Sequence, residues 1–238
     1  SNYEMSGKGF DKPGCDNCRS KNDYDPSFVY KINTETFAIE EAIKVGSVPK
    51  YLASTRNNKL VLISNWTSGD LSIIDTEQNK EIKRISIGRF PRGIAIDNER
   101  NIAYVAVMGG KTIAAINLND YSKTYFEVGS HPRHLCIDER DNILYATLNG
   151  EGKVAKINLM THEVKKLRTG RLPRSMAYCD YNKILYVVNY GSKYLSKINA
   201  ITFQVSDTIK TNSKPIGVTI DKDKGEIWVA CYSGSIMV

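Results

Sequence analysis

The sequence predicts an all-β protein that is built from one repeat of 41 or 42 residues. A proline turn recurs at this nearly constant spacing, and short apolar runs of period two lie between the turns. No stretch keeps a 3.6-residue period for long enough to predict a helix. The turn prolines are Pro49, Pro91, Pro132, Pro173 and Pro215. Since a single period covers almost the whole chain, we expect one domain rather than two.

The first 26 residues form the start of the chain before the regular repeat. Residues 4–26 are rich in Gly, Lys, Asp and Asn and show no apolar alternation, which predicts a long loop. Residues 1–3 resemble the end of a second strand in later repeats, and residues 27–33 resemble the third strand. We therefore expect residues 1–26 to be a strand end with a loop insertion, and residues 27–238 to be the repeats.

Each complete repeat contains four short strand-like runs. In one copy these runs are residues 93–97, 102–108, 112–117 and 124–128, and clusters of Asn, Asp, Gly, Lys and Ser separate them. Runs of this length with period two are typical of antiparallel strands. Four strands in about 40 residues make one blade of a β-propeller. The predicted fold is therefore a propeller of four-stranded antiparallel blades.

The second strands also carry a recognisable motif. Residues 186–189 (Tyr-Val-Val-Asn), 104–107 and 145–148, together with the Gly-x-x-Pro turns, resemble the YVTN repeats of bacterial and archaeal β-propeller proteins, which belong to the WD40-like superfamily. The resemblance implies a binding or scaffold protein in the periplasm, secreted or at the cell surface. Because the chain enters and leaves within a blade, we expect a segment of a longer propeller, with seven blades.

The net charge of +7 and the pI near 9.0 conceal a predicted separation of charge. If the strands alternate in direction, the proline turns and the turns between second and third strands share one face. That face would carry Lys50, Arg89, Arg92, Lys111, Arg133, Lys153, Arg171, Arg174, Lys193 and Lys214. The opposite face would carry Glu35, Asp75, Glu77, Asp97, Glu99, Asp120, Asp138, Glu139, Asp141, Asp180, Asp221, Asp223 and Glu226. No apolar run approaches the roughly 18 residues of a membrane-spanning helix.

An arginine follows the turn proline in three successive repeats, and a lysine does so in the first. At the start of the innermost strands these side chains would surround the mouth of the central channel, where guanidinium groups suit carboxylate or phosphate. The candidate ligand-binding residues are Lys50, Arg89, Arg92, Arg133, His134, Arg171 and Arg174. The expected partner is an anionic small molecule or an acidic protein surface. Duplication of a turn residue without any ligand is the alternative explanation.

An enzymatic alternative depends on His134. The sequence Pro-Arg-His-Leu at residues 132–135 resembles the lactonase relatives of 6-phosphogluconolactonase, in which a histidine faces the channel with acidic and arginine partners. The match fails at the acidic residue, because Asn149 occupies that position and Glu151 is displaced by two. A lactonase or lyase is therefore the alternative, and a lone histidine at a strand start is more typical of a structural role.

A second alternative is the binding of single-stranded nucleic acid. Tyr51, Phe90, Tyr190 and Tyr194 near the basic face would stack on bases while the cations bind phosphates. Many acidic residues dilute the basic ones, and no known nucleic-acid module is present. We do not favour this function.

The five cysteines predict no metal or cofactor site. Cys15 and Cys18 form one Cys-x-x-Cys, but no second pair and no nearby histidine complete a zinc site, and Arg19 replaces the histidine of a haem attachment motif. A local disulfide between Cys15 and Cys18 is the favoured interpretation, and two free thiols are the alternative. Cys136 and Cys179 fall in innermost strands as small buried residues.

Overall fold

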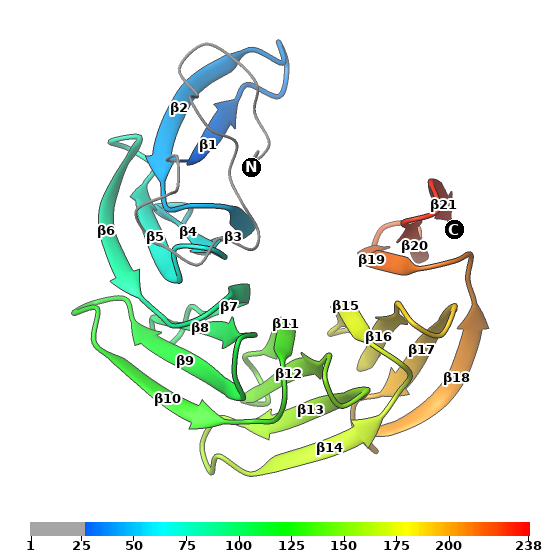
Figure 1. Cartoon of the computed structure of the whole chain (residues 1–238). Helices are drawn as coiled ribbons and strands as arrows, with labels where there is room; N and C mark the ends of the chain where they lie inside the picture. The colour runs from blue at the N-terminus through cyan, green and yellow to red at the C-terminus, as the bar shows by residue number, and fades with distance from the viewer. Residues whose placement is uncertain (1–26) are drawn as a thin grey trace. The chain divides into compact units, whose positions relative to one another are not determined.

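The computed structural model describes residues 27–238, and every regular element in that range is a β-strand (Figure 1). The all-β prediction and the four-stranded repeat are therefore confirmed. The described residues divide into two compact units. The first extends to Gly109 and includes Ala114–Thr124, and the second comprises Gly110–Ile113 and Tyr125–Val238.

The sheets of the first unit follow the chain order. A two-stranded sheet contains β1 (Ser27–Ile32) and β2 (Ile39–Val45). A four-stranded antiparallel sheet contains β3 (Pro49–Ser54), β4 (Leu60–Asn65), β5 (Asp70–Asp75) and β6 (Lys80–Ser86). The next sheet, most of which falls in this unit, contains β7 (Pro91–Asp97), β8 (Ile102–Val107), β9 (Thr112–Asn117) and β10 (Lys123–Glu127). Strands β7 to β10 match the four runs predicted for this repeat to within two residues at each end.

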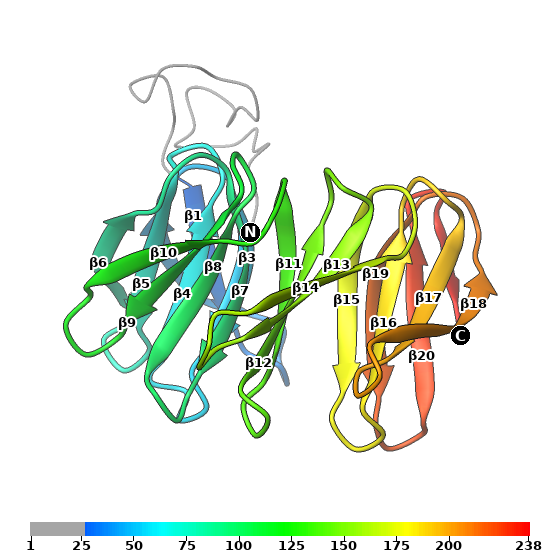
Figure 2. The same ribbon diagram turned by 90° about the horizontal axis from the view of Figure 1, so that it is seen from below.

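The second unit repeats the same arrangement, and its strands run alongside one another in Figure 2. One sheet contains β11 (Pro132–Asp138), β12 (Ile143–Leu148), β13 (Lys153–Asn158) and β14 (Val164–Arg168). The next contains β15 (Pro173–Cys179), β16 (Ile184–Asn189), β17 (Tyr194–Asn199) and β18 (Gln204–Lys210). The last contains β19 (Pro215–Asp221), β20 (Glu226–Cys231) and β21 (Ser235–Met237).

Apolar residues that alternate with polar ones along the strands form separate buried clusters in the two units. In the first unit, Leu62 of β4, Ile73 of β5 and Val105 of β8 belong to one buried cluster. In the second, Tyr145 of β12 and Met176 of β15 belong to another. Each cluster joins residues of two consecutive sheets of its unit, so a single sheet does not bury its apolar face alone.

The proline turns share one local geometry. The residue before each turn proline adopts a left-handed conformation, and the register shifts just after the proline in all five first strands. The left-handed residues are Val48, Phe90, His131, Leu172 and Lys214, with φ between 53° and 59°. An L-residue with a side chain is uncommon in this region. The repeated geometry therefore comes from the turn as a whole rather than from glycine.

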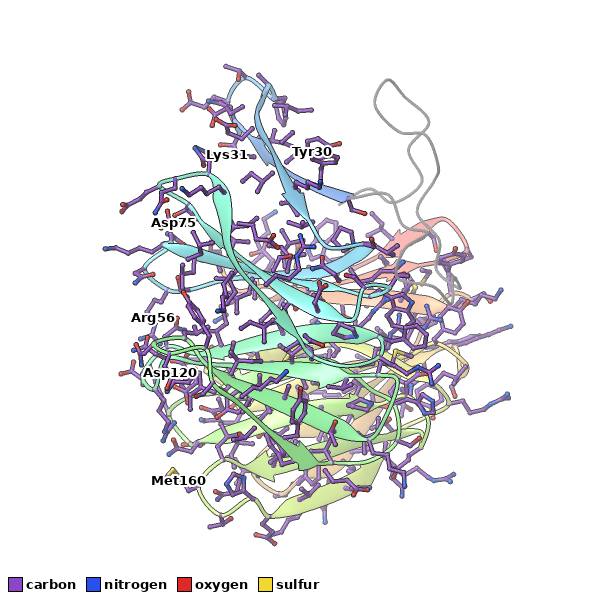
Figure 3. The ribbon with its side chains drawn as sticks, turned by 60° about the vertical axis from the view of Figure 1, so that its left-hand side comes forward. Tyr30, Lys31, Arg56, Asp75, Asp120 and Met160 are labelled. Carbon is purple, nitrogen blue, oxygen red and sulfur yellow. The ribbon has the colours of Figure 1, made fainter. Side chains whose placement is uncertain are left out.

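Figure 3 shows, for the first unit, the turns at the other ends of the strands from the proline turns. These turns join first strands to second strands and third strands to fourth strands. Arg56 follows the first strand of its sheet, and Asp75 and Asp120 stand where third strands lead to fourth strands; all three lie on the same side of this unit. This agrees with the predicted grouping of these turns. The face is not uniformly acidic, however, because Arg56 pairs with Glu99 there at 2.6 Å.

Three sequence predictions concern cysteines, metals and membrane spans. Cys15 and Cys18 lie outside the described residues, so their pairing stays a prediction. Cys136, Cys179 and Cys231 are free thiols, and burial raises the pKa of Cys136 to about 12. Within residues 27–238, no helix is long and apolar enough to cross a bilayer, and no group of three His, Cys, Asp or Glu side chains could hold a metal ion.

Candidate functional site

The structure places the predicted cationic residues at the proline turns of both units. Lys50, Arg89 and Arg92 belong to the first unit, beside the starts of β3 and β7. The remaining members lie beside the starts of β11 and β15 in the second unit, and they are Arg133, His134, Arg171 and Arg174. A convergence of Arg92, Arg133 and Arg174 on one axis would involve both units and stays a prediction.

In the first unit the arginines lie against aromatic rings. The rings of Trp66 and Phe90 are stacked, with centroids 4.6 Å apart and planes 17° from parallel. The guanidinium of Arg92 lies 5.2 Å from the Trp66 ring centre, and that of Arg89 lies 5.2 Å from the Phe90 ring centre. These four residues are called the first-unit platform. Such contacts hold a cation at a surface through the negative faces of the rings.

Hydrogen bonds to the backbone carbonyls of Arg89 and Arg92 hold the first-unit platform in place. The N–H of Gly109 donates to the carbonyl of Arg89 at 2.9 Å, and the hydroxyl of Ser64 donates to the carbonyl of Arg92. A Cβ at Gly109 would stand 2.5 Å from that Arg89 oxygen, which is too close for any other residue to fit without movement. The segment after β8 therefore needs glycine to hold the Arg89 turn.

In the second unit Arg174 takes an equivalent place. Its guanidinium lies 3.7 Å from the ring centre of Tyr190, which directly follows β16. The side chain is half-buried, its Nε is buried without a hydrogen-bond partner, and no carboxylate of the described chain pairs with it. Burial lowers the pKa of Arg174 by disfavouring the charged form. With Arg171, these residues are called the second-unit platform.

A threonine hydroxyl links two consecutive sheets next to this platform. The N–H of His134 donates to Thr147 Oγ1 at 2.9 Å, and that hydroxyl donates to the carbonyl of Arg174 at 2.9 Å. The amide of Asn149 donates to the carbonyl of Pro173 at 3.0 Å. The end of β12 therefore determines where β15 begins, and with it the position of Arg174.

The side chain of His134 has a structural contact. Its Nδ1 accepts a hydrogen bond of 3.3 Å from the N–H of Met176, where β15 regains its regular register. An imidazole nitrogen that accepts a backbone N–H carries no proton of its own at that position. The contact gives His134 a role in holding the next sheet.

Glu151 also belongs to a turn. Its carboxylate accepts the N–H of Ser130 at 2.8 Å and pairs with Lys166 at 3.1 Å and Lys153 at 3.3 Å. Partial burial would raise the pKa of Glu151, but the Ser130 N–H and the two lysines outweigh it and lower the pKa. Both cations hold the carboxylate at the turn, so these contacts provide no support for the acid of a lactonase site.

Of the aromatic residues considered for stacking on bases, two serve the fold. The Tyr194 hydroxyl donates to the carbonyl of Thr169 at 2.8 Å, and Tyr51 packs against the buried core of the first unit. Phe90 and Tyr190 belong to the two platforms. Sequence reasoning missed the stacking role of Trp66, although an aromatic residue after the second strand was visible at Trp66 and Tyr190.

Comparisons with known proteins identify the fold. No protein-family model and no curated sequence matches the chain. The hydrazine synthase structure from Kuenenia stuttgartiensis is similar over 88% of each chain, with 17% identity and a TM-score of 0.60. A protein of unknown function from Desulfotomaculum acetoxidans is similar over 87% of this chain and 73% of its own, with 12% identity and a TM-score of 0.74. At these identities the likeness concerns the fold alone, and it supports a β-propeller-like repeat.

Proposed function

We propose that this protein is a non-catalytic binding propeller of the YVTN-repeat type, exported in a bacterial cell, whose proline-turn face binds an anionic ligand or an acidic protein surface. The observation that carries the proposal is Arg174, a half-buried cation on the Tyr190 ring with no carboxylate partner in the described chain. The likeness of the repeats to YVTN proteins supports a binding role, and the first-unit platform offers a second cationic surface, with two arginines against two aromatic rings.

Charge balance at the second-unit platform favours an anionic ligand. A guanidinium that burial has partly removed from water is costly unless an opposite charge approaches it. An incoming carboxylate or phosphate would restore the balance and accept bidentate hydrogen bonds. The adjacent aromatic ring provides an apolar surface for the part of the ligand next to its charge. An anionic group attached to a planar or apolar body therefore fits this platform better than a free inorganic ion.

The proposal can be tested by fluorescence anisotropy with three labelled anions: an oligo-glutamate peptide, a sulfated oligosaccharide and an oligothymidylate. The wild-type protein should bind at least one of them, and the affinity should fall between about 0.05 M and about 0.3 M salt because screening weakens exposed charge pairs. The three probes distinguish an acidic peptide, an acidic sugar and a nucleic acid as sources of the charge.

Variants locate the binding surface. Arg174→Met and Arg92→Met should each weaken binding about tenfold, since each removes one charge-assisted contact. Arg56→Met is the matched control, because Arg56 lies at the opposite turns and is already paired with Glu99. Equal weakening in all three variants would point to a nonspecific charge effect and contradict the proposal, as would the absence of binding by the wild-type protein.

Export is a separate part of the proposal and needs its own measurement. Cell fractionation of the native host with an antibody against the protein should place it in the periplasmic, surface or secreted fraction. Recovery in the cytoplasmic fraction alone would contradict export without affecting the proposed binding surface.

A further inference from the structure

A small cleft lies in the second unit at the turns opposite the proline turns. It has a volume of about 250 Å³ and is formed between the sheet of β11–β14 and the sheet of β15–β18. Its polar lining includes Tyr145, Lys156, Tyr178 and Lys183, and Ile143 and Ile201 provide apolar surface. None of these residues belongs to the second-unit platform.

The cleft is formed where the repeat departs from its own pattern. Tyr178 occupies the position of Ile96, Ile137 and Ile220 in three of the other four first strands; the fourth, β3, has Ser54 there. Cys179, next to Tyr178, stands where those three strands have aspartate. A repeat that only duplicated its packing residues would keep an aliphatic side chain at position 178.

Lys183 is a second departure in the same cleft. It adopts φ of 54° at the turn position where Asn101 and Asn142 have φ of 53° and 54°. Asparagine tolerates the left-handed region better than lysine does, so the turn geometry does not explain the lysine. Lys156, a third lining residue, stands where β9 has Ala115 and β17 has Lys197, so this lysine is shared with the next sheet. The two departures, Tyr178 and Lys183, meet beside Lys156 in one cleft.

One part of the cleft wall is a closed ionic network. Lys183 Nζ lies 2.7 Å from a carboxylate oxygen of Asp138 and 2.7 Å from one of Asp141, and the Tyr178 hydroxyl donates to Asp138. Burial would raise the pKa of Asp138, but Lys183, Tyr178 and the N–H of Asp141 outweigh it, and the pKa is lowered. Asp138 is therefore a fixed anion with its own partners and is not available as an acceptor for a ligand cation.

The other part of the wall offers unused donors. Lys156 Nζ lies 5.8 Å from the ring centre of Phe203 and donates to the carbonyl of Ala200 at 2.6 Å, which accounts for one of its three N–H groups. Within residues 27–238, no carboxylate comes within ion-pair distance of this ammonium. Lys156 is the direct cross-strand neighbour of Tyr145, whose side chain is 2% exposed. Burial, with nearby charged groups, raises the pKa of Tyr145, so its hydroxyl stays a neutral donor.

We propose that this cleft binds a small organic carboxylate, whose charged end pairs with Lys156, receives a hydrogen bond from Tyr145, and leaves a short apolar tail against Ile143 and Ile201. The volume is below the range of roughly 300–1,000 Å³ that is usual for larger ligands, so the acid has only a few carbons. Because the cleft opens at the turns opposite the proline turns, the proposal is independent of the function proposed above.

The chain provides a matched control for this site. Lys197 and Tyr186 form the same cross-strand pair in the next sheet of the unit, at the repeat positions of Lys156 and Tyr145. There the place of Tyr178 is taken by Ile220, and that of Asp138 by Cys179. The control pair therefore has the same strand context without the tyrosine and aspartate that complete the cleft wall.

The test is calorimetric and NMR titration with sodium butyrate at constant ionic strength, with inorganic phosphate as a second arm. The wild-type protein should bind butyrate saturably, and phosphate should bind more weakly because it cannot use the apolar wall. Lys156→Met should weaken butyrate binding about tenfold or more, as expected from the loss of a charge-assisted contact. Tyr145→Phe should weaken it about threefold, within the range for one neutral hydrogen bond. Lys197→Met and Tyr186→Phe should bind like the wild type.

Each alternative result has a defined meaning. Saturable binding of phosphate without butyrate would overturn the carboxylate assignment, and loss of affinity in Lys197→Met equal to that in Lys156→Met would overturn the location. Absence of saturable binding by both anions would overturn the site. Circular dichroism should confirm that each variant is folded, and Tyr145→Phe keeps the test decisive if Lys156→Met does not fold.

Discussion

Two lysines in successive turns of the second unit reach back to an aspartate of the preceding sheet, but they do so in different surroundings. Lys183 meets Asp138 at 2.7 Å, where the two side chains are 25% and 4% exposed. Lys222 meets Asp180 at 2.9 Å, where they are 65% and 49% exposed. The same connection between sheets is therefore made once beside a core and once in water.

Burial determines how much each ion pair contributes to stability. An exposed pair is screened by solvent and contributes little to stability, whereas loss of one partner from a buried pair leaves an uncompensated charge. The Tyr178 hydroxyl and the N–H of Asp141 add further hydrogen bonds to the Asp138 carboxylate. We infer that the buried pair holds the β11–β14 and β15–β18 sheets together, and that the exposed pair does not have a comparable effect.

The largest expected effect is that of Lys183→Asn, which installs the residue found at the equivalent turns. The free energy of unfolding should fall by about 3 kcal/mol, because Asp138 would stay buried without its cation. Urea denaturation at neutral pH measures this loss. If the free energy of unfolding fell no more than it does for an exposed pair, water would have to reach Asp138. The Lys183–Asp138 and Lys222–Asp180 pairs would then not differ in strength.

A second prediction concerns the pH dependence of that loss. The pKa of Asp138 is lowered in the folded protein, so its stabilising contribution is present above the unfolded-state pKa of about 3.9 and is lost as the pH falls through the folded-state pKa. The difference between wild type and Lys183→Asn should therefore shrink progressively as the pH falls below about 4. Paired urea titrations across this range provide the test, and a difference that stays constant would contradict the assignment to Asp138.

Removal of the second partner of Asp138 should have a smaller effect. Tyr178→Phe keeps the ring and its contact with Tyr145, at 5.5 Å between centroids, and deletes only the hydroxyl that donates to the carboxylate. The expected loss is about 1.5 kcal/mol, which is typical of a hydrogen bond to a charged group. Thermal denaturation compared with Tyr145→Phe separates this loss from a general effect of removing a phenol from the cleft.

The smallest expected effect is that of Lys222→Asn. Because both partners are largely exposed, the change in unfolding free energy should be below about 0.5 kcal/mol and should vanish at high salt. The measurement is the same urea denaturation, repeated at low and high ionic strength. A loss as large as that of Lys183→Asn would contradict the conclusion that burial determines the strength of these pairs.

The fold could be predicted from the sequence because its determinants are periodic. The spacing of Pro91 and Pro132 located the repeat, and the alternation within residues 102–108 and 112–117 located strands to within one residue. The same spacing placed the arginines at their turns. Separation of charge on the two faces was only partly correct, since Arg56 and Lys183 neutralise acidic residues at the turns opposite the prolines.

The sites could not be predicted to the same extent, because they depend on contacts between repeats. Arg92 meets Trp66 of the preceding sheet, and no local pattern links two residues that far apart. The cleft needs Lys156 and Tyr178 from different sheets, and its volume depends on how their side chains pack. The visible signal was the departure of Tyr178 and Lys183 from the other copies of the repeat.

The left-handed residue before each turn proline has a consequence for engineering. Val48, Phe90, His131, Leu172 and Lys214 share nearly the same φ although their side chains are aliphatic, aromatic, basic and ionisable. The backbone at this position accepts very different chemistries, so its shape is separable from the identity of the side chain it displays. Val48 is buried and Phe90 belongs to the first-unit platform, so these two side chains should be kept. A combinatorial library randomised at the exposed positions His131, Leu172 and Lys214 should keep the scaffold while varying the surface.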